Sequence, residues 1–358
     1  LKMVDSSSNK DTPGRADPIF LLSTERSGSN LVRSILGTHT DLSAPHPLET
    51  AYPWGKVTPP KDLPKHRVRN FFRDVLINKH YSFHPLEMAV DIDGVVDRFS
   101  RGKQSHSLLD FQDALYGEYA SQEGTGGWVS KYPALWDCLD DALEYYDDLK
   151  IIYNVRDARD VALSFKSSNA WRYHPFYSAT RWQQEQRRGT ELLENHPDSV
   201  HQLRYKDLLQ DPESVVRGMC EFLEIPFQEE MLYYYETDEA QAAAESAEVF
   251  ENLTSPIMSD NYDKFHQQLP DDEVCLVEKI AGDQLEYFDY DLVYSEAERE
   301  RFEFDLDRYE SEDKTLTRKA ALRDWYQNPR ERVKRQLTKS FAGYLIFRYG
   351  VVEKLLPS

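Results

Sequence analysis

The stretch PIFLLSTERSGSNLVRSILG, residues 18–37, predicts a strand, a polar turn and a helix in direct succession. Residues 19–22 are apolar, which is typical of a buried strand. Serine, glycine and charged residues fill positions 23–29, and apolar residues then recur from position 31 at the spacing of a helix. A buried strand that leads at once into a helix is the building unit of an α/β fold.

The turn of this unit carries groups that bind anions. A helix that begins after a tight turn aims free backbone N–H groups and the positive end of its dipole at that turn. Arg26 adds a guanidinium, and Ser27, Ser29 and Asn30 add short side chains that donate hydrogen bonds. The turn resembles a P-loop without its Gly-Lys-Ser/Thr ending, which argues against ordinary Mg²⁺-ATP chemistry. The alternative is a turn of this composition that binds nothing.

A second strand-to-helix junction lies near the middle of the chain. Residues 150–155, KIIYNV, predict a strand, and the helix that follows starts close to Asp157, a residue type suited to a helix N-terminus. Arg156 ends this strand, and Ser164 lies about two turns into the helix, so both could reach one phosphate at the junction. The alternative is that Arg156 and Arg159 are structural and pair with nearby aspartates.

Together the two junctions resemble the sulfotransferases that use 3′-phosphoadenosine 5′-phosphosulfate (PAPS). In that family, a strand–turn–helix with the pattern RSGS/T holds the 5′-phosphosulfate, and a later RD-x-RD-x-A-x-S segment holds the 3′-phosphate. The resemblance assigns the 3′-phosphate to Arg156 and Ser164. Asn30 stands where the family often has serine or threonine. The residues implied for the 5′ side are Arg26, Ser27, Gly28, Ser29, Asn30 and Leu31.

Further matches follow in the family's order between residues 18 and 294. The segment 203–208, LRYKDL, resembles the one whose tyrosine lies near the adenine, which implicates Tyr205. The segment 253–265 resembles the late loop that closes over the nucleotide, which implicates Ser255 and Lys264. The resemblance therefore implies a P-loop-like sulfotransferase fold.

The implied reaction moves a sulfuryl group from PAPS to a hydroxyl, less favourably an amine, of a small-molecule, lipid or carbohydrate acceptor. In-line displacement would release 3′-phosphoadenosine 5′-phosphate (PAP), with no metal. Arg26 and Lys131, within the family-like segment SKYP, would meet the developing charge. His46 and Glu49 are the two candidates for the base, because the family carries its base after the first helix, and His46 is also expected to line the acceptor site. His174 is a weaker candidate for that acceptor pocket.

Two other functions remain open from the sequence. A P-loop kinase or NTPase would depend on Mg²⁺-ATP, although the missing lysine–hydroxyl ending counts against it. A non-catalytic protein that binds PAP and contacts others through a charged C-terminal region would bind the nucleotide without turnover. Affinity for PAP and ATP, and turnover with acceptors, distinguish the three.

Strands and helices alternate along the chain, which predicts an α/β fold with a mostly parallel sheet and helices on both faces. Ligands bind such sheets at the carboxyl ends of the strands, so Arg26 and Arg156 are expected to share one site. The expected strands are 18–23, 128–130, 150–155 and 200–204. The expected helices are 30–39, 66–80, 106–121, 133–147, 157–168, 178–195 and 212–224.

Composition divides the chain into a polar, disordered leader at 1–17, a sulfotransferase domain at 18–294 and a charged helical extension at 295–358. Residues 271–313 hold 17 acidic and four basic residues, whereas 314–349 hold ten basic and two acidic residues. The basic part predicts either a helix that contacts a membrane surface or partner, or a helical layer packed on the enzyme.

Charge and cysteine content bear on partners and location. The net charge of −20 disfavours nucleic acid as a partner and is typical of a solvated acidic surface. No apolar run is long enough for a transmembrane helix. The three cysteines are far apart and lack metal-ligand spacing, which favours a reducing, cytoplasmic setting over a luminal one. A homo-oligomer is left open.

Overall fold

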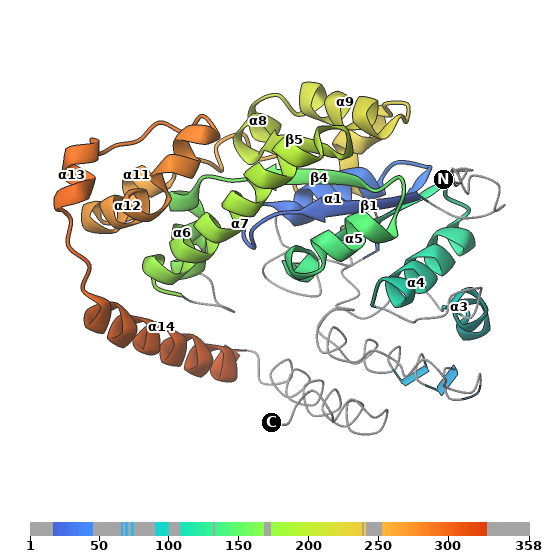
Figure 1. Cartoon of the computed structure of the whole chain (residues 1–358), viewed down its shortest axis with the longest axis horizontal. Helices are drawn as coiled ribbons and strands as arrows, with labels where there is room; N and C mark the ends of the chain where they lie inside the picture. Colours follow the sequence, from blue (N-terminus) through green and yellow to red (C-terminus); the bar gives the residue numbers. More distant parts are fainter. Residues whose placement is uncertain are drawn as a thin grey trace, which may run out of the picture.

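The computed structural model describes residues 17–45, 66, 69–70, 73–74, 90–99, 108–131, 133–167, 173–237, 240 and 253–327. Within these residues the chain forms the α/β fold that the sequence predicts (Figure 1). The predicted leader up to residue 16, most of the helix expected at 66–80, and residues 328–358 lie outside the described residues. The first strand begins at Asp17, so the described fold starts one residue before the predicted domain boundary.

A parallel five-stranded sheet forms the centre of the described fold, in the order β2-β3-β1-β4-β5. β1 occupies the middle position, between β3 and β4. The strand bounds are β1 (Asp17–Leu22), β2 (Leu42–Ser43), β3 (Gly127–Lys131), β4 (Lys150–Val155) and β5 (Val200–Arg204). The apolar strand sequences follow from this arrangement, because helices cover both faces of the sheet.

Successive side chains of each strand point to opposite faces, so each strand contributes to two cores. In β1, Phe20 and Leu22 join one cluster, whereas Ile19 and Leu21 join the other. The first face carries α3 (Ile92–Phe99), α4 (Leu108–Glu123), η2 (Pro133–Asp137), α5 (Leu139–Tyr145), α6 (Ala158–Ser167), α7 (Pro175–Asn195) and α12 (Asp271–Tyr287). The second carries α1 (Ser29–Gly37), α8 (Tyr205–Gln210), α9 (Pro212–Leu223) and η4 (Glu229–Glu236).

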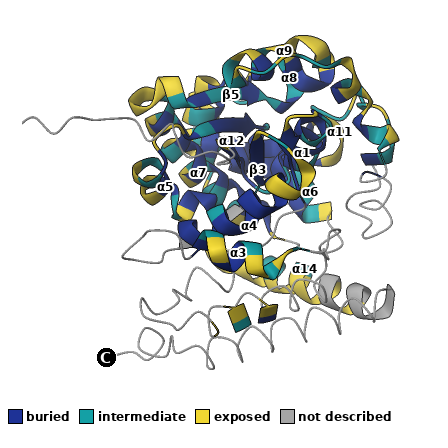
Figure 2. Ribbon diagram, turned by 90° about the vertical axis from the view of Figure 1, so that its right-hand side faces the viewer, coloured by how far each residue is buried: buried dark blue, intermediate teal, exposed yellow. Residues whose placement is uncertain are grey.

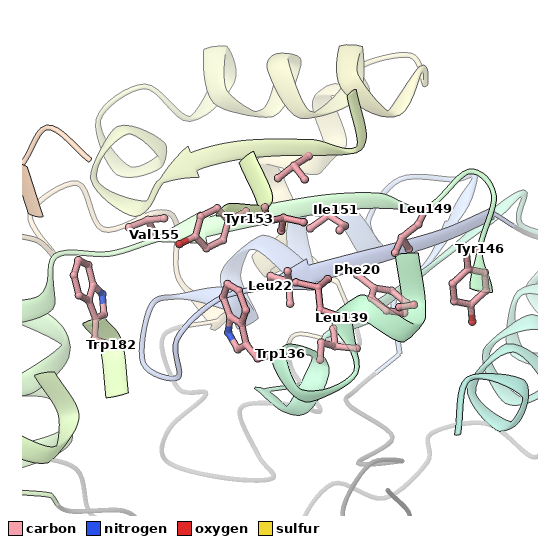
Figure 3. Packing of buried hydrophobic residues seen from close by; sticks show 14 of the residues in the cluster. Phe20, Leu22, Trp136, Leu139, Tyr146, Leu149, Ile151, Tyr153, Val155 and Trp182 are labelled. Carbon is pink, nitrogen blue, oxygen red and sulfur yellow. The ribbon is translucent and has the colours of Figure 1, made fainter. Parts of the chain in front are cut away.

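Aromatic side chains fill much of the first core (Figure 3). The rings of Trp136 and Tyr153 meet edge to face at 5.7 Å, and Phe20 meets Tyr146 in the same way at 5.8 Å. Each such ring is buried, and full burial of a large apolar side chain stabilises the fold by about 1.5–3 kcal/mol. This core therefore holds the strand ends rigidly beneath the turns that follow them.

Several elements differ from the sequence prediction for local reasons. The helix expected at 133–147 is two helices, η2 and α5, because Cys138 leaves the helical region with φ −119° and ψ 15°. Helix α7 starts at Pro175 rather than at 178, because His174 caps it by accepting a hydrogen bond from the N–H of Phe176. The structure also contains β2, α3 and α8, which the sequence analysis did not predict.

The sheet topology brings three strand ends together. From β1 the chain passes through α1 on one face, whereas from β3 it passes through η2 and α5 on the other face and returns at β4. A crevice forms at the carboxyl ends of parallel strands where connections leave on opposite faces, and ligands bind there. The turn after β1, Lys131 at the end of β3 and Arg156 after β4 all lie at this edge.

The described part of the C-terminal region is helical. The helices are α11 (Phe265–Gln268), α13 (Glu296–Arg301) and α14 (Leu306–Gln327), and α14 lies apart from the sheet (Figure 1). Most of the residues of α14 whose burial is described are exposed (Figure 2). Within the described ranges, we find no helix with the length and apolar character needed to cross a membrane.

Candidate active site

The turn between β1 and α1 has the backbone of an anion cradle. Arg26 and Gly28 both adopt left-handed conformations, with φ of 71° and 84°. The backbone N–H groups of Leu31 and Val32 donate hydrogen bonds to the carbonyl oxygen of Gly28. The N–H groups before them have no partner within the helix, and such a turn concentrates positive potential at its centre.

The hydroxyl and carbonyl oxygens of Ser27, in this turn, both lie in the protein interior. The hydroxyl oxygen of Ser27 is completely buried and has no hydrogen-bond partner among the residues that the structure describes. Its carbonyl oxygen accepts a hydrogen bond of 2.8 Å from Nδ2 of Asn154 in β4. Because a buried hydroxyl without a partner is costly, Ser27 Oγ fits a site that gains a hydrogen bond when an anion binds.

Gly28 is required by the residue that faces it. A Cβ atom at this position would lie 2.2 Å from Cε2 of Tyr205, the first residue of α8. Tyr205 is 5% exposed, and its hydroxyl accepts a hydrogen bond of 3.0 Å from Nδ2 of Asn261. Tyr205 therefore packs its ring directly on the turn, and its contact with adenine stays a prediction.

The two arginines predicted for phosphate binding lie beside one another. Nη1 of Arg156 donates to the carbonyl oxygen of Arg26 at 3.0 Å, and Nε of Arg26 donates to Oγ of Ser164 at 3.0 Å. The guanidinium of Arg156 also lies 4.9 Å from the ring centroid of Tyr205. The structure thus brings Arg26, Arg156 and Ser164 together, and their binding of a phosphate stays a prediction.

The electrostatics of this pair favour an anion. Burial lowers the pKa of Arg26, and the charge of Arg156 lowers it further, while Glu25 opposes both effects. Nε of Arg156 is buried and finds no hydrogen-bond partner within the described part of the chain. A bound phosphate or sulfate would relieve the repulsion between the two guanidiniums and supply acceptors to their N–H groups.

Lys131 joins the same edge from the other side of β1. Its Nζ donates to Oδ1 of Asn30 at 2.9 Å, across a sequence separation of 101 residues. Asn30 is the second residue of α1, so the ammonium lies beside the N-terminus of that helix. A cation and a positive helix end are unfavourable neighbours unless an anion lies between or near them.

A late segment of the chain packs against Arg156 and Tyr205. The carbonyl oxygen of Asn261 lies 3.5 Å from Nη2 of Arg156. Asp160 of α6 accepts hydrogen bonds from the backbone N–H groups of Asp263 and Phe265 at 2.9 and 3.1 Å. Burial raises the pKa of Asp160, whereas Arg156 and these N–H groups lower it. The segment predicted to close over the nucleotide is thus attached to α6, the helix that follows Arg156.

The remaining predicted nucleotide ligands lie on this late segment. Ser255 uses its carbonyl oxygen to accept a hydrogen bond of 2.9 Å from the hydroxyl of Tyr234. Lys264 occupies the N-cap position of α11. Lys206 pairs with Asp263 at 2.8 Å and fixes the segment to α8. Nucleotide binding by Ser255 and Lys264 stays a prediction.

Helix α7 supports the turn from the other face, a role that sequence reasoning missed. Nε1 of Trp182 donates to the carbonyl oxygen of Arg156 at 2.9 Å, and Gln186 donates to Oγ1 of Thr24 at 2.8 Å. Arg181 lies between Glu185, at 2.8 Å, and Glu25 of the turn, at 3.5 Å. The sequence predicts a helix over 178–195 but not these contacts, because they depend on how α7 packs against the turn.

Arg159, the second arginine of the RD-x-RD segment, has a structural role. It pairs with Asp157 at 2.6 Å and with the fully buried Glu278 of α12 at 2.5 Å. Its guanidinium also lies 4.1 Å from the ring centroid of Phe265. Hydrogen bonds and ion pairs outweigh burial and raise the pKa of Arg159. This agrees with the structural alternative for Arg159. Arg156 also meets that alternative in part, because its Nη2 lies 3.8 Å from a carboxylate oxygen of Asp160, while its Nη1 contacts the turn.

His174 lies at the junction of α7 and α14. Its Nδ1 accepts from the N–H of Phe176 at 3.2 Å, and its ring stacks on Tyr309 with centroids 4.7 Å apart. Nε2 lies 3.1 Å from a carboxylate oxygen of Glu312 without hydrogen-bond alignment. The backbone N–H of His174 donates to Asp313 at 2.7 Å. These contacts give the ring a structural role, and contact with an acceptor stays a prediction.

The junction between His174 and α14 should weaken as the pH falls below about 6.5. Burial lowers the pKa of His174 from 6.5, although Glu273, Glu312 and Asp313 raise it. A histidine freed from the junction therefore binds a proton more readily than the docked one, so acid favours undocking. We expect amide exchange in residues 306–316, expressed relative to the intrinsic exchange rate of an unfolded peptide at each pH, to accelerate several-fold between about pH 7.5 and about pH 5.5.

The control for this experiment is His174→Asn, which keeps a helix-capping acceptor but does not titrate. We expect the acceleration between the two pH values to be absent from this variant. Equal acceleration in both proteins would assign the effect to other groups, such as the carboxylates of α14.

The two candidate bases, His46 and Glu49, lie outside the described residues. The described residues before this segment end at Ala44 and Pro45, which follow β2. There the buried side chain of Arg33, from α1, donates to the carbonyl oxygen of Ala44. β2 runs parallel to β3, and its last residue, Ser43, pairs with Trp128, three residues before Lys131.

Comparison with known proteins identifies the chain's relatives. A model of the sulfotransferase family matches residues 18–229. An uncharacterized protein of Aquifex aeolicus (strain VF5) is 27% identical over 228 residues, which are 62% of this chain and 27% of that protein. The match therefore spans about a quarter of that relative's length.

Two solved structures share the fold. The sulfotransferase domain from the curacin biosynthetic pathway is 21% identical, with a TM-score of 0.54 over 77% of this chain and 99% of that domain. The sulfotransferase domain from the olefin synthase of Synechococcus PCC 7002 is 22% identical, with a TM-score of 0.53 over 78% of this chain and 96% of that domain. At these identities the likeness concerns the fold alone.

Proposed function

The chain belongs to the sulfotransferase family, and we propose that it transfers a sulfuryl group from PAPS to a hydroxyl of a small-molecule, lipid or carbohydrate acceptor. The observation that carries this proposal is that Arg26, Arg156 and Lys131 lie at the edge of the sheet where α1 begins. Arg156 contacts the carbonyl oxygen of Arg26 in the turn, and Lys131 contacts Asn30 of α1. Three cations beside a positive helix end form a site for a ligand with several negative charges. The catalytic domain is proposed to be residues 18–294, and residues 295–358 its extension.

The residues at this edge fit the two anionic ends of the nucleotide. Arg156 and Ser164 would bind the 3′-phosphate, and the buried Nε of Arg156 supports this because it lacks a partner. The turn N–H groups and the unpartnered hydroxyl of Ser27 would bind the 5′-phosphosulfate. Tyr205, Ser255 and Lys264 would complete the nucleotide site, the first near the adenine and the others from the late segment.

The reaction requires charge stabilisation and one proton acceptor. An acceptor oxygen would attack sulfur in line, the bond between sulfur and the phosphate oxygen would break, and PAP would leave. Arg26 and Lys131 would stabilise the charge on the sulfuryl oxygens and on the departing phosphate. His46 or Glu49 would take the acceptor's proton, with His46 favoured because histidine titrates near neutrality.

Location and partners belong to the same proposal. The described cysteines are free thiols, which supports a reducing, cytoplasmic setting. The acceptor is the expected partner, and contact of the extension with a membrane surface or another protein is a weaker proposal.

Calorimetric titration with PAP, and separately with Mg²⁺-ATP, tests the function. We expect PAP to bind without metal and much more tightly than Mg²⁺-ATP, because ATP lacks a 3′-phosphate for Arg156 and Ser164. Clear Mg²⁺-ATP binding without PAP binding would instead favour a kinase or NTPase. PAP binding without turnover of PAPS across an acceptor panel would favour a non-catalytic nucleotide-binding protein.

A further inference from the structure

The contact between Lys131 and Asn30 joins two elements that meet the bound anion from different sides. Lys131 is the last residue of β3, and it pairs in register with Leu21 of β1. Asn30 stands one residue into α1, whose N-terminus faces the turn. The 2.9 Å hydrogen bond from Nζ to Oδ1 therefore fixes the ammonium at the point where the helix dipole and the turn concentrate positive potential.

The side chain of asparagine is chemically suited to hold a lysine ammonium that interacts with an anion. Its amide oxygen accepts a hydrogen bond but carries no net charge, so the ammonium keeps its full positive charge. An aspartate of the same shape would cancel that charge. A serine or threonine, as the family resemblance expects here, has a shorter side chain with its oxygen on the β carbon. Lysine has several rotatable bonds, so a hydrogen bond to its ammonium restricts the rotamers that it samples.

We propose that the side chain of Asn30 positions the Lys131 ammonium for sulfuryl transfer, rather than binding the nucleotide directly. This inference rests on the proposed function. A preorganised charge stabilises a transition state without reorganising during the reaction, so loss of Asn30 should lower turnover more than nucleotide affinity.

The test is a double-mutant cycle with Asn30→Ala, Lys131→Ala and the double variant. PAP affinity is measured by calorimetry. Turnover is measured as release of PAP from PAPS, with water alone, 2-naphthol or 1-butanol as the acceptor. We expect Asn30→Ala to lower kcat about tenfold while the Kd for PAP changes less than about threefold. In the Lys131→Ala background, the same change should have little further effect on kcat, because the residue that it positions is gone.

Asn30→Thr distinguishes the two roles of this position. A threonine supplies the hydroxyl expected for direct phosphate binding but does not reach Lys131 as asparagine does. We therefore expect Asn30→Thr to lose turnover as Asn30→Ala does. Normal turnover in Asn30→Thr, or independent effects of the two alanine changes, would overturn the positioning role. If the unaltered protein neither binds PAP nor releases it from PAPS, the proposed function itself fails.

Discussion

Gly28→Ala is expected to abolish PAP binding and to destabilise the protein by several kcal/mol. Alanine in a left-handed conformation costs about 1–2 kcal/mol, and the φ of Gly28 is 84°. The added Cβ would also lie 2.2 Å from the ring of Tyr205, and forcing an extra carbon into a packed site costs about 1–3 kcal/mol. Either the ring or the turn must move, and the turn holds the N–H groups proposed for the phosphosulfate.

Gly124→Ala is the matched control for this substitution. Gly124 also has a positive φ, 74°, but nothing lies within 4 Å of a Cβ built there. It should show the backbone cost alone, about 1–2 kcal/mol in urea unfolding, with unchanged PAP affinity in calorimetry. Near-wild-type PAP binding by Gly28→Ala would mean that the turn tolerates displacement and does not hold the ligand as we propose.

The contact between Gly28 and Tyr205 also marks a limit of sequence reasoning. The glycine was identified as part of the turn and the tyrosine as a separate ligand, because each lies in a recognisable local pattern. Their direct packing depends on the position of α8 after β5, on the same face as α1. No periodicity within either segment carries that information.

Local sequence patterns were sufficient to predict the bounds of a strand or helix where those bounds depend on the residues of that element alone. The bounds of β4 and β5 agree with the predicted 150–155 and 200–204, and a mostly apolar run between Lys150 and Arg156 marks β4. A two-residue strand such as β2 is too short for any period to appear. The break between η2 and α5 depends on the backbone of one residue, Cys138, and was equally invisible.

The same distinction applies to the candidate site. The sequence alone was enough to predict that Arg26 and Arg156 lie close together, because residues that follow parallel strands meet at one edge of a sheet. Trp182 and Asn261, which contact Arg156, and Asp160, which binds the late segment, act through contacts between elements distant in sequence. Their sequence surroundings resemble those of ordinary helix or loop residues, so only the folded arrangement reveals their part in the site.

Arg156→Ala is expected to weaken PAP binding by about 100-fold and to remove selectivity for the 3′-phosphate. Hydrogen bonds between charged groups contribute about 1.5–3 kcal/mol, and each 1.4 kcal/mol is tenfold in affinity. The measurement compares PAP with adenosine 5′-monophosphate, which lacks the 3′-phosphate. The unaltered protein should bind PAP far more tightly, whereas the variant should bind the two with similar affinities.

Arg204→Ala supplies the matched control for this last prediction. Arg204 ends the neighbouring strand β5, where it pairs with Asp207 at 2.7 Å, so its removal changes the net charge equally. We expect this control to keep PAP selectivity. Arg156 also contacts the carbonyl oxygens of Arg26 and Asn261, so its loss should lower stability as well, and urea unfolding must confirm that the variant is folded during titration. A folded Arg156→Ala protein that still prefers PAP would move the 3′-phosphate site away from this arginine. The charged partner of the phosphate would then have to be sought in Arg26 or the late segment.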